Sequence, residues 1–166
     1  AGCVATGIFG IGRKIPMNRV NDLGQREGYW RDSLGEGITH ELYYKGGKKD
    51  GLFKCFIRNE LFLFGEYTAD NMSGTWYMFG DEGELRCTID SIELNKDSIY
   101  TGYCRIFCKY KCHSIDYYPS GAVKSEGYMV CDEEFEIEIW EIGEWKYYDE
   151  SGNLIKTKDY GDRRTP

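Results

Sequence analysis

The chain has 166 residues, of which 41% are hydrophobic and 16% aromatic, and its formal net charge is −7 at pH 7. That length suits one ordinary domain or one short repeat array, and the hydrophobic content excludes a disordered acidic tail. The negative charge argues against nucleic-acid binding through a general basic surface, and no apolar run approaches the ~20 residues of a membrane-spanning helix.

The N-terminus allows two interpretations. Ala1-Gly2-Cys3 resembles the end of a bacterial lipoprotein cleavage box, in which the cysteine carries lipid, but loss of an initiator methionine leaves a similar start. Lipid on Cys3 would hold the protein at a membrane surface. Without it, the odd count of seven cysteines fits no secreted disulfide framework and favours a reducing, cytoplasmic compartment. We predict a leader over residues 1–23 and a repeat domain over 24–166.

A short phrase recurs along the predicted domain at multiples of 23 residues. It starts at four glycines: Gly28, Gly51, Gly74 and Gly143. An aromatic residue stands two places after each: Trp30, Phe53, Trp76 and Trp145. Nine places after each start are Gly37, Glu60, Gly83 and Gly152, and a weaker fifth unit is CHSIDYYPSGAV, residues 112–123. Such self-similarity is the signature of a repeat architecture.

Each unit is predicted to be a β-hairpin. WYMF and WKYY are too short and too aromatic for a helix and favour strands, and DEGEL, ESGNL and PSGAV favour turns in which glycine supplies a positive φ. Successive hairpins must lie side by side to bury apolar surface. We therefore predict structural roles for the repeat glycines, in turns or close packing, and a stack of rings that includes Trp30, Trp76 and Trp145.

The segment with chemical potential is Cys104, Cys108 and Cys112, followed by His113. IFCKYKC alternates as a strand does, so the three thiols would share one face but spread over roughly 26 Å, too far for one metal ion. Cys112 and His113 would face opposite ways, which prevents easy activation of the thiol. We expect half-buried cysteines, no catalytic residue, no metal and no cofactor; a thiol or metal site remains the alternative.

Residues 133–144, EEFEIEIWEIGE, alternate most clearly. Glu134, Glu136 and Glu138 would lie on one face, and the parity changes at Trp140, which predicts a bulge. With Tyr147, these three acids form the predicted partner-binding surface, which would suit a basic protein.

The full phrase is G-x-W-x-x-Y-x-x-x-G-x-L, best preserved at Gly143, Trp145, Tyr148, Gly152 and Leu154. It resembles the MORN repeat and its bacterial MORN-variant form. The resemblance covers roughly residues 24–161, with a poorly matching gap at about residues 86–111. The resemblance implies an all-β fold, an elongated, twisted antiparallel sheet of stacked β-hairpins forming an open trough. It also implies scaffolding, partner binding or membrane-surface association, and some bacterial relatives are antitoxin components.

We therefore expect a non-enzymatic protein-binding or scaffold module, antitoxin-like if its partner is a basic protein. Exposed edge strands would offer unpaired backbone groups for self-association. A membrane-surface lipoprotein is the second expectation.

Overall fold

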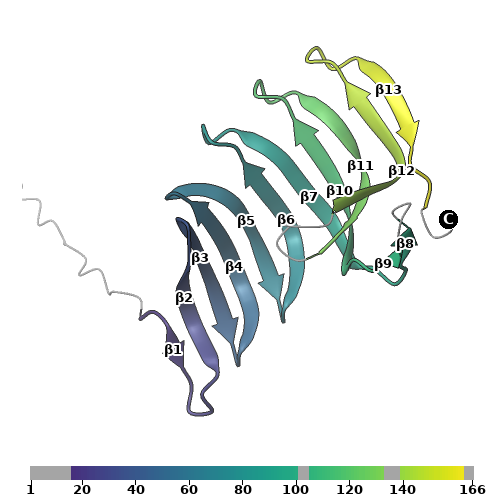
Figure 1. Ribbon diagram of the computed structural model, residues 1–166. Helices are drawn as coiled ribbons and strands as arrows, with labels where there is room; N and C mark the ends of the chain where they lie inside the picture. The colour runs from purple at the N-terminus through teal and green to yellow at the C-terminus, as the bar shows by residue number, and fades with distance from the viewer. Residues whose placement is uncertain (1–15, 101–104, 133–138, 163–166) are drawn as a thin grey trace, which may run out of the picture.

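The computed structural model describes residues 16–100, 105–132 and 139–162, and the elements in these ranges are all strands. Eleven of them form one antiparallel sheet in the order β1-β2-β3-β4-β5-β6-β7-β10-β11-β12-β13 (Figure 1). The predicted all-β fold, an open sheet of stacked hairpins, is confirmed. In the described ranges, no helix has the length and apolar character needed to cross a bilayer.

The strands of this sheet follow the chain order, with one interruption after β7. Their bounds are β1 Arg19–Val20, β2 Arg26–Gly35, β3 Ile38–Lys45, β4 Lys48–Ile57, β5 Glu60–Thr68, β6 Asn71–Phe79, β7 Leu85–Leu94, β10 Tyr110–Tyr117, β11 Val123–Cys131, β12 Ile139–Tyr148 and β13 Leu154–Asp159.

The interruption is a separate two-stranded sheet, β8 (Ile99–Tyr100) with β9 (Arg105–Ile106). It lies within residues 86–111, the stretch that fits the repeat poorly. Ile99 and Cys108 pack with Val130 in a small second core. Val130 alternates with the main-core residues Met129 and Cys131, so it lies on the opposite face of β11. The β8–β9 segment, which we call the β8–β9 excursion, therefore packs its apolar side chains on the face of β11 opposite to the main core.

Glycines end the hairpins at four turns that share one hydrogen-bond pattern: residues 21–25, 80–84, 118–122 and 149–153. In each, the fourth residue is a glycine with positive φ whose N–H donates to the first carbonyl, as Gly152 does to Asp149 at 2.9 Å. The turn at 21–25 is the one that the repeat phrase did not predict. The β4–β5 turn instead uses Arg58 and Asn59, both with positive φ, so the next position needs no glycine and Glu60 begins β5.

The starting glycines lie inside strands. Gly51, Gly74 and Gly143 have φ of 123°, 66° and 62°, and each lies where the pairing register shifts. The bulge predicted at Trp140 is wrong by three residues, since pairing is regular from Ile139 to Ile142 and shifts at Gly143. Glycine is suited to this position because a bulge needs a conformation that other residues resist.

The main core covers one face of the sheet and is built on aromatic rings. Trp76 and Phe53 are fully buried, with ring centroids 5.5 Å apart, and Tyr67 meets Trp76 edge-on at 5.1 Å. The Trp76 ring lies directly over Gly65 of β5, and Trp145 lies in the same way over Gly127 of β11. A strand glycine thus makes room for each of these two tryptophans.

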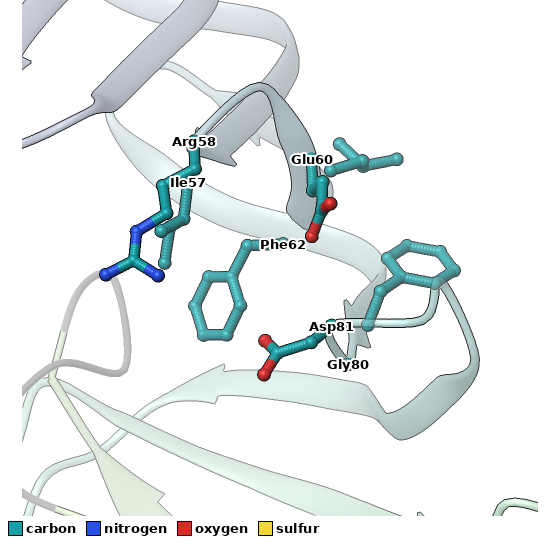
Figure 2. A pocket seen from close by; sticks show the side chains of 8 residues that line it. Ile57, Arg58, Glu60, Phe62, Gly80 and Asp81 are labelled. Atoms are coloured by element: carbon teal, nitrogen blue, oxygen red, sulfur yellow. The ribbon is translucent and has the colours of Figure 1, made fainter.

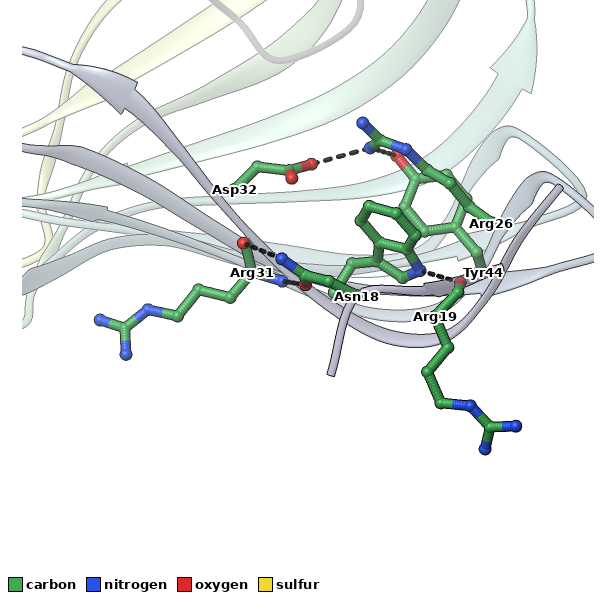
Figure 3. A network of polar contacts seen from close by, with 7 residues as sticks. Asn18, Arg19, Arg26, Arg31, Asp32 and Tyr44 are labelled. Carbon is green, nitrogen blue, oxygen red and sulfur yellow. Dashed lines mark hydrogen bonds and ion pairs between the residues drawn. The ribbon is translucent and has the colours of Figure 1, made fainter. Parts of the chain in front are cut away.

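Asn18 covers the β1 end of the sheet. Its backbone N–H donates to the Tyr29 carbonyl at 3.0 Å. Its side-chain amide bonds both backbone groups of Arg31 (Figure 3), accepting from the N–H at 2.8 Å and donating to the carbonyl at 3.1 Å. The amide therefore replaces a strand residue, and β2 keeps its edge backbone groups satisfied at this point.

Arg26 adds to this closed end. Its guanidinium lies 4.4 Å from the Trp30 ring centroid and 5.1 Å from that of Tyr44, and it pairs with Asp32 at 2.8 Å. Cation–π contact and ion pairing together hold the Trp30 and Tyr44 rings in place at this end of the sheet.

Candidate functional site

The predicted acidic surface falls mostly outside the described residues, since Glu134, Glu136 and Glu138 lie there. Tyr147 is described: it lies in β12, half-buried, and its hydroxyl is 2.9 Å from that of Tyr160. Burial, followed by this hydrogen bond, raises the pKa of Tyr147 above its ordinary value. The phenol is therefore neutral at physiological pH and can act as a hydrogen-bonding group.

The cysteine segment is divided between two cores. Cys3 and Cys104 lie outside the described residues. The prediction that Cys108 and Cys112 share one face is wrong, because Cys108 packs in the small core with Val130 and Cys112 packs in the main core with Met129. The β8–β9 excursion breaks the strand alternation on which the prediction depended.

His113 is remote from thiol chemistry. Its Nδ1 is 3.5 Å from Asp90 Oδ1 and its ring stacks edge-on with Tyr128 at 5.3 Å, on the face of β10 opposite to Cys112. His40 of β3 pairs across the sheet with Cys55 of β4 and packs on Phe53. It is therefore several strands away from Cys112 and His113 of β10. In the described ranges, no three His, Cys, Asp or Glu side chains gather as metal ligands would.

Cys87 and Cys112 are protonated thiols of the core. Burial raises the pKa of Cys87 to about 12, and its Sγ is 3.3 Å from Ser114 Oγ. The contact with Cys131, 3.6 Å between the sulfur atoms, and burial also raise the pKa of Cys112. A nucleophilic thiol needs the opposite shift.

We expect the folded state to lose stability at alkaline pH through Cys87. Its folded-state pKa of about 12 exceeds the ordinary thiol value of 9.0, so its contribution is complete below pH 9 and declines as the pH rises toward 12. At pH 10.5 the loss should be about 2 kcal/mol. Urea unfolding from pH 8 to 10.5 measures it, and Cys87→Ala should flatten the slope; an unchanged slope in this variant would contradict the assignment.

One hollow of about 360 Å³ lies on the core face between β6 and β12. Its walls include Met78, Trp145 and Tyr147, and several of its polar groups are already bonded within the protein: Ser125 donates to Asp116 at 2.7 Å, and the Tyr147 hydroxyl is bonded to that of Tyr160. A ligand that used these groups would have to displace bonds that the protein already makes.

A longer groove runs along the hairpin turns, and we call it the turn-edge groove. It joins three adjoining hollows of about 350, 400 and 590 Å³, neighbouring hollows having residues in common. Its lining comes from the β4–β5 turn, the β6–β7 turn and the tip of the β10–β11 turn: Ile57, Arg58, Glu60, Leu61, Phe62, Phe79, Gly80, Asp81, Glu82, Gly83, Glu84, Arg86 and Pro119.

The floor of this groove is apolar and its rim is charged. Figure 2 shows the Phe62 ring facing the same hollow as the Glu60 and Asp81 carboxylates. Phe62 and Phe79 are half-buried, whereas Glu60 and Asp81 are exposed. Exposed acids beside unfilled apolar surface leave interactions that a second molecule could complete.

Repeat spacing brings the two acidic turns together. Glu60 and Asp81 are 21 residues apart in the sequence, close to the repeat length, and belong to successive turns at the same end of the hairpins. The sequence interpretation missed this groove because it treated turn residues only as backbone formers. The feature of the sequence that could have indicated the groove is the pair of apolar residues directly before these turns, Ile57 at the end of β4 and Phe79 at the end of β6.

A scan against models of protein families found no match to this chain. Searches of the curated proteins and of the solved structures likewise found none.

Proposed function

We propose that the protein is a non-enzymatic, protein-binding module, a divergent array of MORN-like hairpins that holds its partner in the turn-edge groove. The observation that carries this proposal is the groove itself, where apolar side chains of β4, β5 and β6 remain accessible beneath exposed charges. Interfaces combine these two features, an apolar centre and a polar rim.

Three features of the chain support the repeat-array part of the proposal. Hairpins add one after another in chain order, the same glycine turn recurs, and each of Trp76 and Trp145 covers a strand glycine in the neighbouring strand. An array of this kind presents its turns in a row along one edge, which is a geometry suited to an extended partner segment.

Site-specific photo-crosslinking tests the proposal. A benzophenone amino acid is placed at Glu82 on the groove rim and, as the control, at Lys48, an exposed residue at the opposite end of β4 from the groove residue Ile57. Each protein is irradiated in extract of the cells that produce it. We expect one discrete protein adduct from position 82 that is absent from position 48.

Competition makes the result specific to the groove. Unlabelled wild-type protein should suppress the adduct, whereas Ile57→Ser, which removes an exposed apolar side chain of the floor, should suppress it less. The same adducts from both positions, or none from position 82, would contradict the proposed function.

A further inference from the structure

We infer that the occupant of the turn-edge groove is a basic segment of the protein partner, in which a lysine or arginine lies beside an apolar side chain. This inference rests on the proposed function and adds the chemistry of the partner. The cation would meet Glu60 and Asp81, and the apolar side chain would cover Phe62 and Phe79.

The charge balance of the groove is the first observation. Four acids line it, Glu60, Asp81, Glu82 and Glu84, against two bases, Arg58 and Arg86. Glu60, Asp81 and Glu82 are exposed, whereas Glu84 is half-buried and accepts the Glu82 N–H at 3.1 Å.

The second observation is that the part of the chain that the structure describes supplies no counter-charge to Glu60 and Asp81. No lysine, arginine or histidine of the described ranges lies within 4.0 Å of the Glu60 or Asp81 carboxylate, although Arg58 lines the same hollow. Both carboxylates are therefore open to a cation from outside.

The third observation is the apolar lining of the same hollow. Ile57, Leu61, Phe62 and Phe79 line the hollow that Glu60 and Asp81 border. The methylene stem of lysine or arginine packs on such a surface while its charged end reaches the rim. A free metal ion would use only the carboxylates, whereas a basic and apolar peptide uses both parts of the groove.

Long-range electrostatics favour the same partner. The net charge of the chain is −7, which attracts a basic molecule from solution and raises its association rate at low salt. Complementary charge then fixes where on the surface the segment settles.

The test is selection from a phage-displayed library of random peptides on the immobilised wild-type protein. The enriched peptides are measured against two double variants with equal changes in charge. One is Glu60→Lys with Asp81→Lys, in the groove. The matched control is Asp22→Lys with Glu150→Lys, two exposed acids in other hairpin turns.

We expect enrichment of peptides that carry lysine or arginine next to apolar residues. Their affinity should fall at least about tenfold in the groove variant and less than about twofold in the control, and should weaken as sodium chloride is raised. Circular dichroism of both variants confirms that the sheet is intact.

Two results would overturn the inference, and they differ in what they mean for the proposed function. Enriched peptides without basic residues that still lose affinity on Ile57→Ser would refute the basic partner and leave the groove as a binding site. An absence of groove-dependent peptides, or equal losses in both double variants, would refute the inference, and the crosslinking at position 82 would then decide the proposed function alone.

Discussion

Replacing Trp76 by alanine is expected to lower the free energy of unfolding by about 3–5 kcal/mol, the range for a large aromatic side chain in a core. Trp76 is fully buried and contacts the rings of Phe53 and Tyr67. Because the ring lies over Gly65, the position beneath it has no side chain that could fill the cavity. The indole N–H also donates to the Ser73 carbonyl at 3.1 Å, a bond that alanine cannot make.

Urea unfolding followed by far-ultraviolet circular dichroism measures this loss, with Trp30→Ala as the control. Trp30 occupies the same repeat position but is half-buried at the β1 end of the sheet. Its replacement should cost only about 1–2 kcal/mol, in proportion to the smaller area that it buries. Equal losses for the two variants would show that Trp76 has no special place in the core.

Replacing Gly65 by alanine is expected to cost about 3 kcal/mol, an unusual penalty for adding one methyl group. The new Cβ would overlap Cδ2 of Trp76, and that indole cannot move aside because its surroundings are filled. Gly127→Ala should behave similarly, since its Cβ would lie 2.5 Å from the Trp145 ring. Thermal or urea unfolding of each variant gives the loss directly.

Two controls separate this clash from a general intolerance of alanine. At Gly80 the new Cβ would meet the far ends of the Glu84 and Arg86 side chains, both of which are flexible and can rotate away, so Gly80→Ala should cost less than about 1 kcal/mol. In a Trp76→Leu background, Gly65→Ala should cost clearly less than in the wild type, because the overlapping ring is gone. A full penalty in that background would refute the proposed contact.

The repeat phrase was enough to predict the fold because its residues act locally. Gly83 and Gly152 have the positive φ that a tight turn requires, whatever surrounds them, and strand alternation follows from the pleat. Twist and stacking then leave few arrangements for consecutive hairpins.

Features that join distant segments were harder to predict. Gly65 precedes Trp76 by 11 residues, and Gly127 precedes Trp145 by 18, so no constant spacing links ring and glycine. A glycine inside a strand pattern does indicate a close approach, and that was the signal available. The excursion at β8–β9 could not be predicted, because nothing local in residues 86–111 says which face of the sheet it will cover.

The site was predicted least well, since side chains of separate turns form it. In the repeat phrase, Glu60 is only the residue that stands where the other three units have a glycine. In the structure, its carboxylate faces the same hollow as Asp81 of the next turn on that edge. The alternation of a strand predicts the face of the sheet on which a side chain lies. It does not predict which side chains meet at the ends of the strands. Charge and apolar surface at those ends must be compared between successive repeats.

The neighbour-to-neighbour order of the strands also bears on how the chain folds. From β1 to β7 every strand pairs with the one just synthesised, so each new hairpin closes a short loop and meets a template already in place. Folding can therefore advance from the N-terminal hairpins while the rest of the chain is still being made. The return from β7 to β10 is the first long closure, and it is the step at which this advance would pause.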